Sequence, residues 1–484
     1  MSHRTSSPVP ASRTTRRQSG ARCGNRKQRG QALVYGLFIM TGGLAALFFL
    51  FNTGQLSSEK SKLVNTADAV AYSAGVMHAR TLNYLAYTNR AMLANTVAIA
   101  QLVSLSSWRQ YADTAAQRGS RLGNPVKYPA YFSSYLALQE RSDNSNGGGE
   151  RDELEKLARQ ADEAISGLLR NAQTTAYQGM LTARQQVMDE VAEANYRRGA
   201  DGTVVAEPLP SGPDSFRSFV KEYTGNERER FGELAQTAAK LDRFQESRSW
   251  SLDATYPDCS TARNHNHTDW IARAGGTELL GLDEWKAIDT MSEHVWKPQN
   301  QWDTQCLRPV EKIVGTGGQS AAETASVDPD PRHYDYSVLK NKFNTPLAMA
   351  TSLSSSWGYS GIPEFFDLSR EDIESEDPSL RFSVRLRRHV AQTSTSEGRS
   401  RIVVTPRLNN NRANAPSNEL VAVSTSKVYF RRPLGSCAGG LGGSRDNCRG
   451  GHETGSLFNP YWHVGLVQDG SVATARALQG VALP

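Results

Sequence analysis

Acidic side chains are absent from the first 30 residues, although eight lysines and arginines occur there. The formal charge of the whole chain is +6, so removing these eight charges leaves the rest at about −2. This balance argues against a basic nucleic-acid-binding face on the body, and we expect no nucleic-acid partner. Because residues 1–30 also have almost no large apolar side chains, we expect a disordered basic tail on the cytoplasmic side.

Long hydrophobic runs are also scarce, and a mean hydropathy of −0.52 excludes a protein with many membrane spans. The exception is residues 31–51, which contain no charge and would extend about 31 Å as a helix. A cleaved signal peptide and a buried core helix are the alternatives, but the run exceeds a signal peptide's apolar region and no clean cleavage site follows. We therefore expect a transmembrane helix in lipid over residues 31–54, with the N-terminus inside because cations precede it.

Cysteine is rare, with five in the chain. Cys23 lies in the tail, but four lie beyond the span, where an oxidising compartment favours disulfides: Cys259, Cys306, Cys437 and Cys448. Three pairings are possible, and Cys259 with Cys306 and Cys437 with Cys448 is favoured because the second pair closes a short glycine-rich loop. Zinc is the alternative, but the chain has no C-x-x-C pair, so we expect no metal and no cofactor.

Proline is absent from residues 55–117, and Gly75 is the only glycine there, which predicts a long helix outside the membrane. Five apolar side chains recur at steps of three and four and would form one stripe along this helix: Leu63, Ala67, Val70, Ala74 and Met77. The stripe fits a packed core helix. Alternatively, it fits self-association between copies through the N-terminal helix.

The chain as a whole predicts an α+β fold, in which the transmembrane helix continues into a long-helix bundle and a β-rich domain follows. Helical periodicity marks residues 55–250 as a helical extracytoplasmic domain, and its loss marks residues 251–484 as a β-rich one. A second helix after a loop at Asp143–Gly149 would pair antiparallel with the first. The other expected elements are a hairpin near Gly199–Val205, a helix over Ser215–Gln245, and strands at Phe382–Leu386, Ile402–Thr405, Leu420–Ser424 and Lys427–Phe430.

The patterns of known catalytic sites are missing. The glycine-rich runs Gly315–Ser320 and Gly435–Gly451 fit neither a P-loop nor a dinucleotide fingerprint, so we interpret both as surface loops. His265 and His267 could hold a metal if they shared a strand face, but no third ligand lies at a telling distance. His294 stands alone. These observations favour a protein that is not an enzyme.

Two segments near the N-terminus, RGQALVYGLF from Arg29 and KLVNTADAVAYSA from Lys62, resemble the N-terminal region of TadE/TadG-like proteins of the Flp (tight adherence) pilus system. That family has a membrane helix entering an alanine-rich helix with an Ala-Asp-Ala core, which Ala67, Asp68 and Ala69 match here. The resemblance implies a bacterial inner-membrane protein with a periplasmic or extracellular body. Its implied partners are pilus assembly or secretion proteins.

Cleavage near the N-terminus would distinguish a processed pseudopilin from an uncleaved anchor among the proteins that this chain resembles. Pseudopilins of the system are cut after a glycine and usually carry a glutamate five residues later; Gly30 is present here, but the fifth residue is Tyr35. This departure favours an uncleaved anchor. The expected function is a membrane-anchored structural component of pilus assembly, and the alternative is an envelope-anchored hydrolase with its site in residues 251–484.

Overall fold

A computed structural model describes residues 31–118, 128–143, 147–196, 204–209, 214–253, 269–298, 307–325, 341–395, 398–399, 418–432 and 455–467. Several predictions fall outside these residues: the tail, Gly30, Cys259, Cys306, Cys437, Cys448, His265, His267, Ile402–Thr405 and Gly435–Gly451. They stay predictions.

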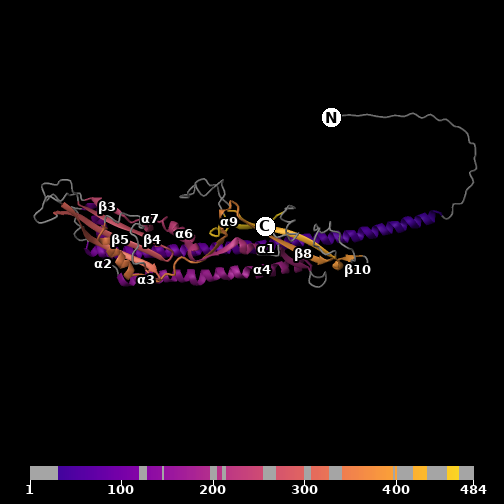
Figure 1. The fold of residues 1–484 in the computed structure, drawn as a ribbon, viewed down its shortest axis with the longest axis horizontal. Coiled ribbons are helices and arrows are strands. Elements are labelled where there is room, and N and C mark those ends of the chain that lie inside the picture. Colours follow the sequence, from indigo (N-terminus) through magenta and orange to yellow (C-terminus); the bar gives the residue numbers. More distant parts are fainter. Residues whose placement is uncertain are drawn as a thin grey trace, which may run out of the picture.

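One helix forms the axis of the molecule. Helix α1 (Gln31–Arg118) contains 88 residues without interruption and is about 132 Å long. In Figure 1 its N-terminal part projects alone from an elongated body, whereas the rest runs the length of that body. The long helix that the sequence predicts is confirmed, and it is continuous with the apolar run.

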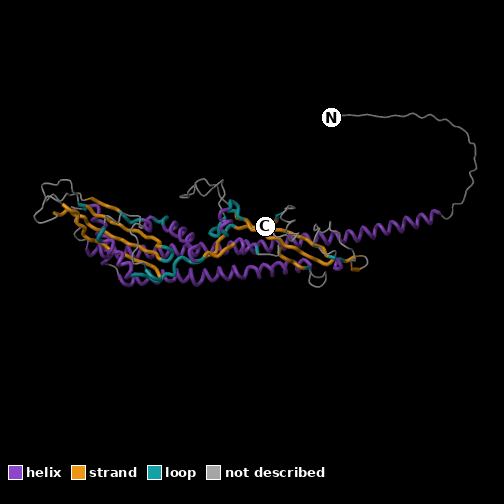
Figure 2. The backbone as a smooth tube through the Cα atoms, viewed as in Figure 1, coloured by secondary structure: helices purple, strands orange, loops and turns teal. Residues whose placement is uncertain are grey.

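The helices that follow turn back along α1. They are α2 (Pro129–Asp143), α3 (Gly147–Glu163), a π-helical turn (Ala164–Leu169) and α4 (Arg170–Tyr196). Gln173 at the start of α4 donates to Thr88 of α1, whereas Tyr196 at its end lies against Lys62. The two helices are therefore antiparallel, as predicted, and Figure 2 shows them side by side.

Two four-stranded antiparallel sheets lie along α1. The sheet nearer the projecting helix has the order β1 (Val205–Leu209), β8 (Ser379–His389), β11 (Glu419–Phe430), β12 (Trp462–Leu466), and the distal sheet has the order β3 (Trp250–Asp253), β4 (Trp270–Leu280), β5 (Glu284–Pro298), β6 (Leu307–Ala322). Two-stranded pairs are β2 (Val220–Tyr223) with β7 (Phe365–Leu368) and β9 (Ser394–Thr395) with β10 (Gly398–Arg399). The α+β class is confirmed.

Short elements complete the fold, and the structure corrects two expectations. These elements are the helices α5 (Ser215–Phe219), α6 (Glu229–Ala239), α7 (Arg243–Glu246), α8 (Asn344–Ser354) and α9 (Arg370–Glu374). Two 3-10 turns lie at Gly225–Arg228 and Val390–Gln392. The single helix over Ser215–Gln245 is wrong, because β2 interrupts it to pair with β7. The hairpin expected near Gly199–Val205 lies mostly outside the described residues and stays a prediction; the described strand beside it, β1, pairs with β8. The two strands predicted within residues 420–430 are one strand, β11.

The hydrophobic cores combine α1 with each sheet. Near the projecting helix, Leu63 and Val70 pack with Val384 and Leu386 of β8. At the distal end a second core joins α1 to α2 and to strands β4, β5 and β6. The cores thus draw residues from both sides of the predicted boundary between residues 250 and 251. That boundary stays a prediction.

The glycine-rich run Gly315–Ser320 corrects a further expectation, because it is part of strand β6 rather than a surface loop. Alternate residues of a strand point to opposite faces. A Cβ at Gly317 would collide with the backbone of α1 at Ser107, and a Cβ at Gly318 would collide with the backbone of α8 at Ala348. The missing side chains therefore let two helices lie directly on the two faces of the distal sheet.

Candidate functional site

The N-terminal part of α1 exposes an apolar surface on every side. An 18-residue window near the N-terminus has a mean hydropathy of 2.1, and none of it is buried. Leu33, Ile39 and Phe49 are each more than 70% exposed. Soluble proteins rarely expose so large a contiguous apolar surface, whereas a lipid bilayer would cover it. The helix is therefore long and apolar enough to cross a membrane.

The first contacts between α1 and the body occur just beyond the apolar run. Two cations lie over the ring of Tyr196 at the end of α4: Lys62 Nζ is 4.3 Å and the Arg388 guanidinium carbon 4.6 Å from the ring centre. The buried Arg388 also forms an ion pair with Glu59 of α1. These contacts tie α1 to both α4 and β8 where it leaves the body, and so fix the direction of the projecting helix.

Lys60 forms a second tie at this level. Its ammonium group donates to the carbonyl oxygen of Val421 in β11. Burial lowers the pKa of Lys60 to about 8, because a charged ammonium loses hydration beside the sheet. A few residues before it, Leu56 is the first buried apolar side chain of the helix. The transition from exposed to packed helix thus takes place within about two turns.

The stripe predicted from the sequence lies within this packed part. Leu63, Ala67, Val70 and Ala74 are fully buried against the chain's own strands and α4, and Met77 is half-buried. The structure thus supports the packed-core alternative for these side chains. Self-association stays a prediction. Within the Ala-Asp-Ala motif, Ala67 is buried, whereas Asp68 and Ala69 are half-buried.

Amide side chains of α1 hold backbone groups of the body. Asn83 donates to the carbonyl oxygen of Trp462 at 3.0 Å and accepts from the Trp462 N–H at 2.9 Å, as a neighbouring strand would. Asn89 donates to the carbonyl oxygens of Phe366 at 2.8 Å and Leu457 at 2.7 Å. We did not predict these contacts; the signal in the sequence is two asparagines, six residues apart, in a helix that has no acidic residue between Asp68 and Asp113.

The comparisons with known proteins bear on this same part of α1. Residues 30–79 match the family model described as "Tad: Putative Flp pilus-assembly TadE/G-like". The TadE/G-like region thus covers the apolar run, the α1 residues that contact the body just beyond it, and the whole stripe from Leu63 to Met77. No curated protein matches the chain, and no solved structure matches it.

His78 lies at the end of the TadE/G-like region, in a buried polar cluster. Its imidazole stacks on Phe216 with ring centres 5.4 Å apart, and its Nε2 lies 3.2 Å from Arg184 of α4. Arg184 pairs in turn with Asp214 at 2.6 Å. Burial lowers the pKa of His78 to about 3, and the Arg184 charge adds to this effect, while Asp214 opposes it. The imidazole is therefore neutral in the folded protein.

This neutral histidine predicts acid sensitivity. Because the pKa of His78 is about 3 when folded and near 6.5 when unfolded, the unfolded state binds a proton first as the pH falls below 6.5. The free energy of unfolding should thus fall by about 2 kcal/mol between pH 7.5 and pH 5 from this group. Urea titrations of the full-length protein in detergent should show that His78→Gln removes this slope, whereas His463→Gln, which changes an exposed imidazole, retains it. Equal slopes for wild type and His78→Gln would contradict the assignment.

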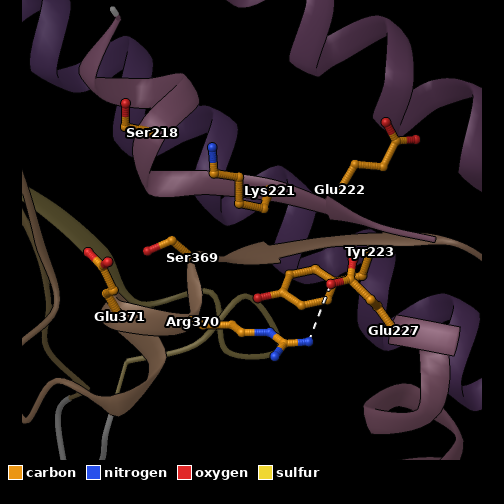
Figure 3. A pocket seen from close by; sticks show the side chains of 8 residues that line it. All are labelled: Ser218, Lys221, Glu222, Tyr223, Glu227, Ser369, Arg370 and Glu371. Carbon is orange, nitrogen blue, oxygen red and sulfur yellow. Dashed lines mark hydrogen bonds and ion pairs between the residues drawn. The ribbon is translucent and has the colours of Figure 1, made fainter. Parts of the chain in front are cut away.

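A cleft of about 490 Å³ lies outside the TadE/G-like region. It is lined by Ser218, Lys221, Glu222, Tyr223, Glu227, Ser369, Arg370 and Glu371. Figure 3 shows Arg370 reaching towards Glu227, with which it pairs at 3.3 Å, beside the Tyr223 ring. The Tyr223 hydroxyl donates to the Leu368 carbonyl, which holds the ring in place. The lining combines both signs of charge. Its Ser369 hydroxyl donates to the Asp372 carboxylate at 2.5 Å and accepts from the Asp372 N–H, so it serves as the N-cap of α9.

Of the histidines named for a hydrolase, the structure describes His294, which does not line this cleft. His294 is buried, stacks in parallel on Trp270 with ring centres 4.8 Å apart, and places Nε2 3.1 Å from the Asn341 side-chain oxygen. Its partners are thus an indole and an amide. Among the described residues, no group of three or more His, Cys, Asp or Glu side chains could hold a metal ion.

Proposed function

We propose that this chain is a membrane-anchored structural component of Flp pilus assembly in the bacterial inner membrane. In this proposal the basic tail is cytoplasmic, residues 31–54 cross the bilayer once, and the body is periplasmic or extracellular. One observation supports this proposal. Residues 30–79, which match the TadE/G-like family model, form an exposed apolar helix that continues without a break into the core of the body.

The continuity of α1 suggests how such a component would act. A helix that is in lipid at one end and bound by α4, β8 and β11 at the other holds the body in one orientation above the membrane. The sheets then extend along the same axis to the distal end (Figure 1). We propose that the protein works by positioning contact surfaces through helix packing, without catalysis.

A charge test addresses the anchor. The double substitution Leu44→Arg and Leu47→Arg should reduce the fraction of protein that resists carbonate extraction, because arginine near the centre of a span costs about 2.5–3.5 kcal/mol per residue. Both leucines are at least 60% exposed in the structure, so the body should still fold. The matched control is Val64→Arg, on the same helix but beyond the membrane. Equal extraction resistance of the double variant and wild type would count against the proposed span.

Assembly is tested in cells that make the pilus. Strains lacking this chain should lose surface pili, and the full-length protein should crosslink to pilus assembly proteins in native membranes. Normal piliation together with an absence of such crosslinks would refute the proposal. Sequencing the N-terminus of the membrane-extracted protein then separates an intact anchor beginning at Met1 from a processed chain beginning at Gln31.

A further inference from the structure

A second face of α1 is mostly exposed: four of its six side chains are exposed and two are half-buried. This face lies between β12 and α4. Asn83, on one side of it, donates to Trp462 of β12, and Thr88, on the other side, accepts from Gln173 of α4. We call this face the outer stripe, which comprises Val76, Arg80, Tyr84, Tyr87, Ala91 and Ala94. Its members step by three or four residues, so they lie on one side of the helix.

The side chains of the outer stripe suit the packing of another helix. Tyr84 and Tyr87 are 41% and 63% exposed, and Arg80 is exposed beside them. The small Ala91 and Ala94 next to them leave room for the side chains of a facing helix. Tyrosine and arginine are also the residue types that contribute most to protein interfaces, because they combine apolar area with polar groups.

Charge narrows the kind of partner. Neither Arg80 nor Arg90, which is exposed at the edge of the stripe, forms an ion pair or a side-chain hydrogen bond within the described part of the chain. No acidic residue occurs between Asp68 and Asp113 of α1. By contrast, the buried Arg184 and Arg388 each have an acidic partner. With respect to the described residues, the stripe therefore presents a positive surface without paired carboxylates, which is complementary to acidic groups.

A second copy of the chain is a poor occupant. If two copies are anchored in one membrane, as the proposed function requires, a two-fold pair has both α1 helices parallel with equal heights facing each other. Arg80 would then face Arg80 of the second copy, and Arg90 would face Arg90. Such like-charge contacts oppose association, and the stripe has no carboxylate to offset them.

We infer that the outer stripe binds an acidic helix of a different protein. Counting from Phe51 at the end of the apolar run, Val76 lies about 38 Å and Ala94 about 65 Å beyond the membrane. The partner helix spans about 20 residues at that height and carries carboxylates that meet Arg80 and Arg90. Two steps of this inference rest on the proposed function: the distance of the stripe from the membrane, and the argument that a second copy of the chain does not bind it.

Photo-crosslinking in native membranes tests the inference with the full-length protein. Tyr87→p-benzoylphenylalanine should give an adduct with another protein, and the crosslinked peptide should be an acidic segment with helical spacing. Adding Arg80→Glu and Arg90→Glu should lower the adduct yield about tenfold, because both attractive contacts become repulsive. The matched control, Arg217→Glu with Arg243→Glu, changes two exposed arginines elsewhere and should leave the yield unchanged.

Four outcomes would overturn the inference: no adduct from Tyr87, an adduct with a second copy, an adduct with residues 468–484 of the same chain, or a yield that is insensitive to charge reversal. Photolabel at Leu241, which is 84% exposed, measures non-specific labelling. Carbonate extraction of the same samples tests the anchor separately. An acidic helical partner that has no part in pilus assembly would contradict the proposed function but retain the inference.

Discussion

The substitution Gly317→Ala should lower the free energy of unfolding by about 3 kcal/mol. Gly317 is buried in β6, and a Cβ there would come closer than van der Waals contact to the Ser107 carbonyl and the Tyr111 N–H of α1. Both obstacles are backbone atoms of a long helix, which cannot move aside as a flexible side chain can. The helix and the sheet would have to separate, and the distal core between them would lose contacts.

The matched control is Gly179→Ala in α4, where nothing lies within 4 Å of the added Cβ. That change should stabilise the protein by about 0.5–1 kcal/mol, because alanine restricts the unfolded chain and favours a helix. Urea unfolding of the full-length protein in detergent, followed by tryptophan fluorescence, measures both variants. If Gly317→Ala is as stable as wild type, then α1 does not lie on this sheet as closely as the structure shows.

Removing the negative charge of Asp289 from the distal core should lower the free energy of unfolding about as much as Gly317→Ala does. Asp289 of β5 is fully buried and binds Arg248 through both carboxylate oxygens, at 2.7 and 2.9 Å. It also accepts from Arg273 at 3.2 Å and from Ser107 of α1 at 2.7 Å. Asp289→Asn leaves the buried Arg248 without a carboxylate, which should cost about 3–5 kcal/mol.

Asp283→Asn is the control for this prediction. Asp283 is 71% exposed and pairs with Arg228 at 3.4 Å, so its loss should change the free energy of unfolding by less than about 0.5 kcal/mol. The same urea titration measures both. A small effect at Asp289, equal to that at Asp283, would show that the buried arginines find other compensation.

Local sequence patterns predicted the elements that depend on local chemistry. The charge-free run at 31–51 and the absence of proline from residues 55–117 are enough to specify α1, because helix propensity and apolar length act along the chain. The spacing from Leu63 to Ala74 showed, for the same reason, that these side chains share one face of the helix. The resemblance to the TadE/TadG-like family came from this segment, and the family model matches it at residues 30–79.

Elements that depend on distant partners were not predictable in this way. Gly315–Ser320 has the composition of a loop, and it becomes a strand only because β5, α1 and α8 surround it. Val220–Tyr223 lies within helical periodicity, but it pairs with β7, about 145 residues later in the chain. The polar contacts of Asn83, His78 and Asp289 likewise join segments more than 100 residues apart.

The sequence by itself therefore determined that the chain begins with a basic tail and an apolar helix long enough for a bilayer, since charge and apolar length are properties of a continuous segment. Only the tertiary structure decided which face of α1 is covered and which remains exposed. Periodicity shows that residues share a face, but burial depends on the strands and helices that pack there. The buried stripe and the outer stripe lie on one helix, and contacts with α4, β8 and β12 distinguish them.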